Sequence, residues 1–257
     1  MKRPTPSFEW RRTGFESEAP STAPSGRSPS PAFAGADAMT LRLYLITPPL
    51  EDPAAFAPAL EEALGAGDVA AVLLRLAAAD ERTRINRVKA IAPAVQRRDV
   101  ALLLDGMPEI AARAGADGAH LTGVEAFAAA LALLKPDRIA GAGGLASRHD
   151  AMLAAETGAD YVMFGDPDRR GRRASLDETL ERLSWWAELF EVPCVGYAAS
   201  LDEVTALRET GADFIALGEW IWNEPKNLSA AIAAAAAAAA PAPAGEGDRP
   251  KGDGGGL

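Results

Sequence analysis

The chain has 257 residues, a net charge of −10 and one cysteine. The acidic balance argues against nucleic acid as a partner, because binding to a phosphate backbone needs a basic face. A single cysteine excludes a disulfide framework and a thiolate metal site, and the apolar run around Cys194 predicts a buried structural thiol.

The two ends of the chain differ in composition from its middle. Residues 1–39 are rich in Pro, Ser, Ala and Gly without hydrophobic periodicity, so we expect a disordered N-terminal extension. They hold no apolar segment of the kind that a secretory signal needs, which makes the cytoplasm the expected location. Residues 241–257 return to Gly, Pro and charge and predict a disordered C-terminal tail. The alanine run Ala230–Ala240 is too short and too weakly apolar to span a bilayer, so we expect a terminal helix and no membrane partner.

Short apolar runs alternate with helical patterns between these ends. The expected strands are Leu41–Thr47, Val69–Arg75, Val100–Leu104, Gly118–Leu121, Arg138–Gly141, Asp160–Phe164, Pro193–Tyr197 and Phe214–Leu217. The expected helices are Pro53–Ala66, Asp80–Arg98, Pro108–Ala114, Val124–Leu134, Ser147–Thr157, Leu176–Phe190, Leu201–Thr210 and Leu228–Ala240. Eight strands that alternate with helices favour a (β/α)8 TIM barrel over residues 40–240, rather than an open doubly wound sheet.

A Gly-Ala-Asp phrase stands before three of the expected strands, in Gly115–Leu121, Gly158–Gly165 and Gly211–Gly218. Each copy ends a helical pattern with glycine, which suits a left-handed helix cap, and then enters a buried apolar run. The aspartates that precede strands are Asp68, Asp99, Asp117, Asp137, Asp160 and Asp213. We expect structural roles for them, as turn and helix-end caps.

The strand ends and the loops after them build the active face of such a barrel, whereas the strand starts serve stability. The candidates at this face are Thr47, Arg75, Asp105, His120, Thr122, Glu125, the loop 141–144, residues 166–173, residues 197–200 and Gly218-Glu219. Because His120 lies inside a strand, we expect a satisfied residue of the barrel interior.

The order of several short phrases resembles the thiamine-phosphate synthase family, which includes related thiazole tautomerases. The phrases are YLIT, a strand ending in Leu-Arg, GADGAHL, GADYVMFGDP, VPCVGYA and GADFIALGEWI, over residues 41–225. The resemblance implies a reaction that joins hydroxymethylpyrimidine diphosphate to thiazole phosphate with loss of pyrophosphate. It implies small phosphorylated pyrimidine and thiazole substrates, and Mg²⁺ with cationic side chains to hold the leaving group.

The resemblance carries over to only part of the family's catalytic equipment. Arg75 is retained at the end of the second strand, whereas Leu73 and Ala77 stand where the family has Gln and Lys. Asp105 and Gly106 stand where the family has Asn-Asp for pyrophosphate and metal, and Glu125 falls at the family's second metal carboxylate. Asp105 and Glu125 would then form a rebuilt acidic pair suited to Mg²⁺. The alternative is that Asp105 caps the following helix and Glu125 is a solvated residue of a first helical turn.

Loop residues supply the remaining implied positions. Arg173 falls near a family Lys in the loop after the sixth strand, either as a phosphate clamp or as part of a solvated charge run. The substrate-binding positions are Arg75, Gly143, Gly144, Gly165, Ala198, Ala199 and Gly218. Glu219 replaces a Ser that cradles phosphate in the family, and a carboxylate there repels phosphate unless a cation intervenes.

Two alternatives to a divergent synthase stay open. A tautomerase-like isomerase would use His149 as its acid or base, although this residue is displaced from the family position. A barrel without catalysis would bind a thiamine precursor or a protein partner.

A homo-oligomer is compatible with the sequence, since the tryptophans Trp185, Trp186, Trp220 and Trp222 suit either an interface or packing under the helices.

Overall fold

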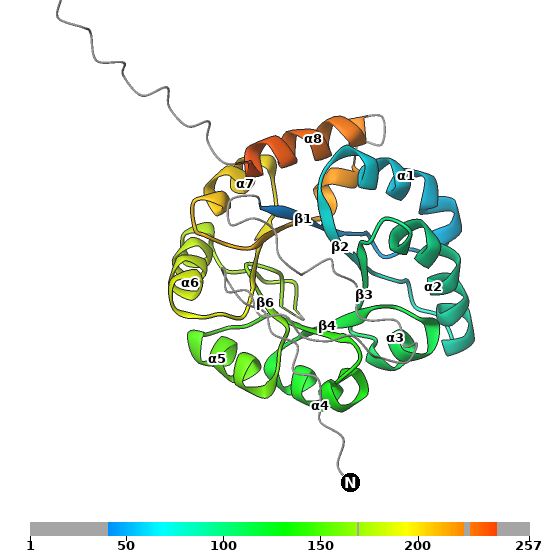
Figure 1. Cartoon of the computed structure of the whole chain (residues 1–257), viewed down its shortest axis with the longest axis horizontal. Helices are drawn as coiled ribbons and strands as arrows, with labels where there is room; N and C mark the ends of the chain where they lie inside the picture. The colour runs from blue at the N-terminus through cyan, green and yellow to red at the C-terminus, as the bar shows by residue number, and fades with distance from the viewer. Residues whose placement is uncertain (1–40, 169, 224–226, 241–257) are drawn as a thin grey trace, which may run out of the picture.

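A computed structural model describes residues 41–168, 170–223 and 227–240, which form a ring of helices around a closed sheet (Figure 1). The parallel strands pair in chain order, and β8 closes the barrel on β1. They are β1 (Arg42–Ile46), β2 (Val69–Leu74), β3 (Ala101–Asp105), β4 (Gly118–Thr122), β5 (Ile139–Gly143), β6 (Tyr161–Phe164), β7 (Cys194–Ala198) and β8 (Phe214–Leu217). The predicted (β/α)8 barrel is confirmed; the tails predicted at 1–39 and 241–257 lie outside the described residues.

The helices follow the strands as expected. They are α1 (Pro53–Ala66), α2 (Glu81–Gln96), α3 (Pro108–Ala114), α4 (Val124–Leu134), α5 (Arg148–Thr157), α6 (Leu176–Leu189), α7 (Leu201–Arg208) and α8 (Leu228–Ala239). The alanine-rich α8 packs between α7 and α1 and completes the ring (Figure 1). No helix in the described part of the chain has the length and apolarity that a membrane span requires. The cytoplasmic location stays a prediction.

Four strands, β3, β4, β5 and β7, end one or two residues beyond the runs that predicted them, and one short helix was not foreseen. β3 includes Asp105, which pairs with His120, and β5 includes Gly143, which pairs with Thr122. Backbone pairing carries these strands into polar and glycine residues, which an apolar pattern cannot reveal. A 3-10 helix, η2 (Glu219–Trp222), follows β8 directly.

The repeated Gly-Ala-Asp phrase has a common geometry. Gly115, Gly158 and Gly211 have φ values of 80°, 115° and 79°, so each stands in the left-handed region predicted for it. Each following aspartate bonds twice to one residue of the preceding strand: its N–H donates to that residue's carbonyl, and its carboxylate accepts from that residue's N–H. The pairs are Asp117 with Leu102, Asp160 with Ala140 and Asp213 with Cys194, with carboxylate-to-amide distances of 2.8, 2.7 and 2.9 Å. The aspartates are structural, but they join strands rather than cap helices.

A chain of buried polar side chains crosses the barrel interior. The Tyr44 and Tyr161 hydroxyls lie 2.9 Å apart, and the Tyr161 hydroxyl lies 2.9 Å from Nδ1 of His120. Burial raises the pKa of Tyr44 and of Tyr161, so both phenols stay protonated at neutral pH. His120 is therefore the satisfied interior residue that the sequence predicts, and Cys194 is buried as expected.

Candidate active site

Arg75 stands at the centre of a charged group at the carboxyl ends of the strands. Its guanidinium Nε lies 3.4 Å from a carboxylate oxygen of Asp105, and Nη1 pairs with Glu219. The backbone of Arg75 is held in turn: its N–H donates to the hydroxyl of the buried Thr47 at 3.0 Å, and its carbonyl accepts from Leu50 at 2.9 Å. The structure thus brings Arg75, Asp105 and Glu219 together at one mouth of the barrel.

The loop after β8 is a tight turn that places Glu219. The Ala198 carbonyl accepts from the Gly218 amide at 3.1 Å and from Nε1 of Trp220 at 3.0 Å. A Cβ added at Gly218 would lie 2.4 Å from the Tyr197 hydroxyl, so the close approach of the tyrosine side chain favours glycine here. The amide of Gly218, a predicted substrate-binding position, is therefore bonded within the protein.

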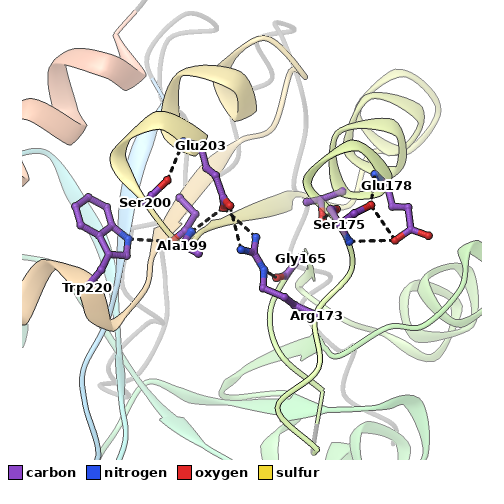
Figure 2. Close-up of polar contacts among 10 residues, drawn as sticks. Gly165, Arg173, Ser175, Glu178, Ala199, Ser200, Glu203 and Trp220 are labelled. Carbon is purple, nitrogen blue, oxygen red and sulfur yellow. Dashed lines mark hydrogen bonds and ion pairs between the residues drawn. The ribbon is translucent and has the colours of Figure 1, made fainter.

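Arg173 is fixed over the loop after β7 (Figure 2). Its two Nη atoms donate to the two carboxylate oxygens of Glu203 at 3.0 and 2.9 Å, and its Nε donates to the Gly165 carbonyl at 3.1 Å. The Ala199 amide donates to the same Glu203 carboxylate at 2.8 Å, and the Arg173 guanidinium carbon lies 5.2 Å from the Tyr197 ring centre. Arg173 is thus a fixed cation at the mouth rather than part of a solvated charge run.

The charge on Glu203 follows from this geometry. Burial raises its pKa, but the hydrogen bonds from Arg173 and from the Ala199 amide outweigh burial and hold the pKa below its usual range. Glu203 is therefore ionised at neutral pH and forms a bidentate pair, the strongest geometry of a guanidinium with a carboxylate.

The glycine loop after β5 rests on a buried carboxylate. The Gly144 amide donates to Asp166 at 2.8 Å, and Nε2 of His120 lies 3.8 Å from the same oxygen. A Cβ added at Gly143 would lie 2.4 Å from His120 Nε2 and 2.5 Å from Asp166, so only glycine fits. Gly143 and Gly144 therefore cover the buried polar chain, and the Gly144 amide is bonded to Asp166.

Glu125 lies on the first turn of α4, at a cavity of about 360 Å³. The cavity is also lined by Thr122 at the end of β4, Gly123 after it, Gly144 after β5, and Arg170. Its volume is in the range of small-molecule sites. Asp105 and Glu125 supply two oxygen ligands of the type that Mg²⁺ prefers, but within the described residues no three His, Cys, Asp or Glu side chains cluster as a metal site. Asp105 does not line this cavity but faces Arg75, and no described contact joins it to Glu125, so the Mg²⁺ site stays a prediction.

His149 lies apart from these contacts. It is exposed on the first turn of α5, next to Arg148, whose guanidinium contacts Trp185 and Glu181. Among the described contacts, none joins His149 to Arg75, Arg173 or the glycine loop.

The structure shows contacts of Asp166 and Glu203 at the mouth that the sequence did not predict. Asp166 lay within a candidate loop, but nothing in the sequence indicated its bond to Gly144. Glu203 stands three residues after Ser200, a spacing that is typical of a helix capping box. The sequence therefore indicates a capping role for Glu203 and gives no sign of a contact at the mouth.

Together these contacts define a (β/α)8-barrel protein with a charged, glycine-lined site at the carboxyl ends of its strands. A family model described as thiamine monophosphate synthase matches residues 43–221. The chain belongs to this family, as the phrases in its sequence predicted. It is 44% identical over 195 residues to a thiamine-phosphate synthase of Rhodospirillum centenum, covering 75% of this chain and 94% of that protein.

Other comparisons agree. A thiamine-phosphate synthase of Hyphomonas neptunium is 38% identical over 199 residues, covering 74% of this chain and 90% of the relative. A solved thiamine phosphate pyrophosphorylase from Pyrococcus furiosus superposes with a TM-score of 0.65 at 24% identity, covering 79% of this chain and 96% of that one. This structure supports the barrel fold.

Proposed function

We propose that this chain is a thiamine-phosphate synthase that couples hydroxymethylpyrimidine diphosphate to thiazole phosphate. The bond between the pyrimidine methylene carbon and the diphosphate oxygen breaks, and pyrophosphate leaves with the electron pair. The thiazole nitrogen lone pair then forms the new carbon–nitrogen bond, so no proton transfer is needed at the reacting atoms. The observation that carries the proposal is the 44% identity to a synthase over 94% of that protein's length.

The contacts of Arg75 support a role in binding the diphosphate. Its guanidinium is always charged, lies at the mouth and is held by its backbone contacts to Thr47 and Leu50. Cationic donors aimed at a leaving group stabilise the charge that develops on it. Asp105 and Glu125 are the residues that would hold Mg²⁺, which when bound would neutralise part of the pyrophosphate charge.

The opposite side of the mouth suits the thiazole phosphate. Arg173 and the Ala199 amide point at one place, where three N–H groups converge on an anion. Gly165, Ala198 and Gly218 shape the loops around it. Two separate cationic centres, Arg75 and Arg173, match a reaction with two phosphorylated substrates.

The alternatives receive less support from the structure. A tautomerase-like isomerase needs an acid or base at the mouth, whereas His149 is exposed on α5 without a described contact to the other candidates. A binding protein without catalysis would not need the retained Arg75 to be fixed among two carboxylates. The homo-oligomer stays a prediction.

The test compares two arginine variants of the full-length protein. Both precursors are incubated with Mg²⁺, and thiamine phosphate is followed by chromatography. We expect turnover by the wild type and a loss of about a hundredfold or more in kcat/KM for Arg75→Ala, since a charge-stabilising donor contributes on this order. Arg97→Ala is the matched control. Arg97 directly follows α2, its side chain is 67% exposed, and it pairs with Glu61 of α1. Absence of turnover in the wild type, or equal effects of both variants, would overturn the proposal.

A further inference from the structure

Glu203 is the carboxylate on which the donors of the β7 side of the mouth converge. Both Nη atoms of Arg173 and the backbone amide of Ala199 donate to it, at 3.0, 2.9 and 2.8 Å (Figure 2). A planar guanidinium and a backbone amide that share one anion are the elements of a phosphate site. In this structure the place is filled by the carboxylate of Glu203 itself.

The donors keep their positions by contacts that do not involve Glu203. Nε of Arg173 donates to the Gly165 carbonyl at 3.1 Å, and the guanidinium lies over the Tyr197 ring at 5.2 Å. The Ala199 amide belongs to the backbone between β7 and the Ser200 cap of α7. Removal of the Glu203 carboxylate would therefore leave the three donors pointing at the same place.

The Glu203 side chain is also free to leave without unravelling its helix. The start of α7 is secured by the Ser200 hydroxyl, which accepts from the Glu203 backbone amide at 3.4 Å. This bond fixes the Glu203 backbone and does not use its carboxylate. The Glu203 side chain is 18% exposed and the Arg173 side chain is 25% exposed, so the pair is partly open to solvent.

We propose that the Glu203 carboxylate occupies the place of a substrate phosphoryl group, and that this phosphoryl group displaces it on binding. The inference rests on the proposed function, because it assigns the thiazole phosphate to this place. A phosphate monoester carries about −1.5 to −2 charges at neutral pH and three acceptor oxygens, so it competes for the donors better than a carboxylate does. Glu203 thereby acts as a specificity residue, since a ligand without a dianionic group cannot displace it.

Phosphate binding measures this competition without any turnover. Inorganic phosphate is titrated calorimetrically into the full-length wild type, Glu203→Gln, Arg173→Gln and the double variant. We expect Glu203→Gln to bind phosphate about tenfold tighter, because the internal competitor loses its charge and one partly exposed ion pair is removed. The gain should vanish in the double variant, which lacks the guanidinium. Glu188→Gln, which removes an exposed glutamate of α6, controls for the change in net charge and should leave the affinity unchanged.

A purely supporting role for Glu203 predicts the opposite sign. If the carboxylate only holds Arg173 in place, Glu203→Gln will bind phosphate as weakly as the wild type or more weakly, and that result overturns the inference. Circular dichroism at equal protein concentration establishes that each variant is folded. A second substitution, Glu203→Ala, removes the competitor without an amide and should also bind phosphate more tightly.

The two proposals fail in different ways. The wild type could make no thiamine phosphate while Glu203→Gln still shows a gain in phosphate affinity that depends on Arg173. In that case the proposed function is wrong, but the displacement of the Glu203 carboxylate by phosphate is supported. If the wild type turns over but neither Glu203 variant gains phosphate affinity, the synthase stands and the displacement is wrong. In an active enzyme, the Glu203→Gln variant should also show a lower KM for thiazole phosphate without a matching rise in kcat.

Discussion

Arg75 and Glu219 form an ion pair across the mouth of the barrel, between the end of β2 and the loop after β8. Sequence reasoning expected the Glu219 carboxylate to repel a phosphate unless a cation intervenes, and Arg75 is that cation. The same guanidinium lies 3.4 Å from Asp105, so one positive charge faces two carboxylates. A substrate phosphate must therefore compete for Arg75, as another must compete for Arg173 in our proposal.

Removal of the Glu219 charge should strengthen binding of pyrophosphate. In Glu219→Gln, Arg75 keeps Asp105 as its only described carboxylate partner, and its charge becomes more available to the leaving group. We expect the inhibition constant for product pyrophosphate to fall about threefold to tenfold, because partly exposed pairs of this kind contribute about 1 kcal/mol. Steady-state inhibition measures this change. An unchanged or higher inhibition constant would show that Glu219 does not compete for Arg75.

The buried polar chain should contribute to stability through its central member. Tyr161→Phe removes a hydroxyl that contacts both Tyr44 and Nδ1 of His120, and leaves both without this partner. We expect a loss of about 1–3 kcal/mol in the free energy of unfolding, measured by urea denaturation. Tyr44→Phe is the matched control, since it removes the end of the chain and one described contact. A loss for Tyr161→Phe no greater than that for Tyr44→Phe would contradict the assigned connectivity.

The aspartates of the repeated phrase should affect stability but not chemistry. Asp213→Ala leaves the Cys194 amide without the carboxylate that accepts from it at 2.9 Å. Because this contact lies at the strand starts, opposite the mouth, we expect a loss of about 1–3 kcal/mol in the free energy of unfolding with kcat/KM unchanged. Glu188→Ala, at an exposed position of α6, should cost less than about 0.5 kcal/mol. A large fall in kcat/KM for the folded Asp213→Ala variant would contradict a purely structural role for this aspartate.

The sequence predicted the fold because its signals are local. The Gly-Ala-Asp phrase, followed by a buried apolar run, occurs three times, and each copy specifies a helix end and a strand start. The contacts of the mouth are not local: Arg75 and Glu219 lie 144 positions apart, and Arg173 and Glu203 lie 30 apart. Alignment with family phrases placed the arginines at the mouth, but the residues that neutralise them became visible only when the strands closed into a barrel.

Glu203 gives the stability of the protein a pH dependence of defined sign. Its folded pKa lies below the ordinary value of 4.5, because hydrogen bonds from Arg173 and Ala199 outweigh burial. A group of this kind contributes stability above the unfolded pKa, and the contribution is lost as pH falls through the folded pKa. The difference in free energy of unfolding between the wild type and Glu203→Gln should therefore shrink as pH falls from 4.5.

Urea denaturation in phosphate-free buffer measures this difference at neutral and acidic pH. Other carboxylates with lowered pKa values, such as Asp168 and Glu178, are present in both proteins and cancel in the comparison. A difference that stays constant from neutral pH to about pH 3 would contradict an ionised, paired Glu203.

The most direct test of the account is the stoichiometry of products formed by the wild type from the two precursors with Mg²⁺. Thiamine phosphate and pyrophosphate are quantified in the same reaction, with each precursor omitted in turn. The account predicts that the two products accumulate in equal amounts and only when both precursors are present. Pyrophosphate release without thiamine phosphate, or no product from both precursors, would contradict it.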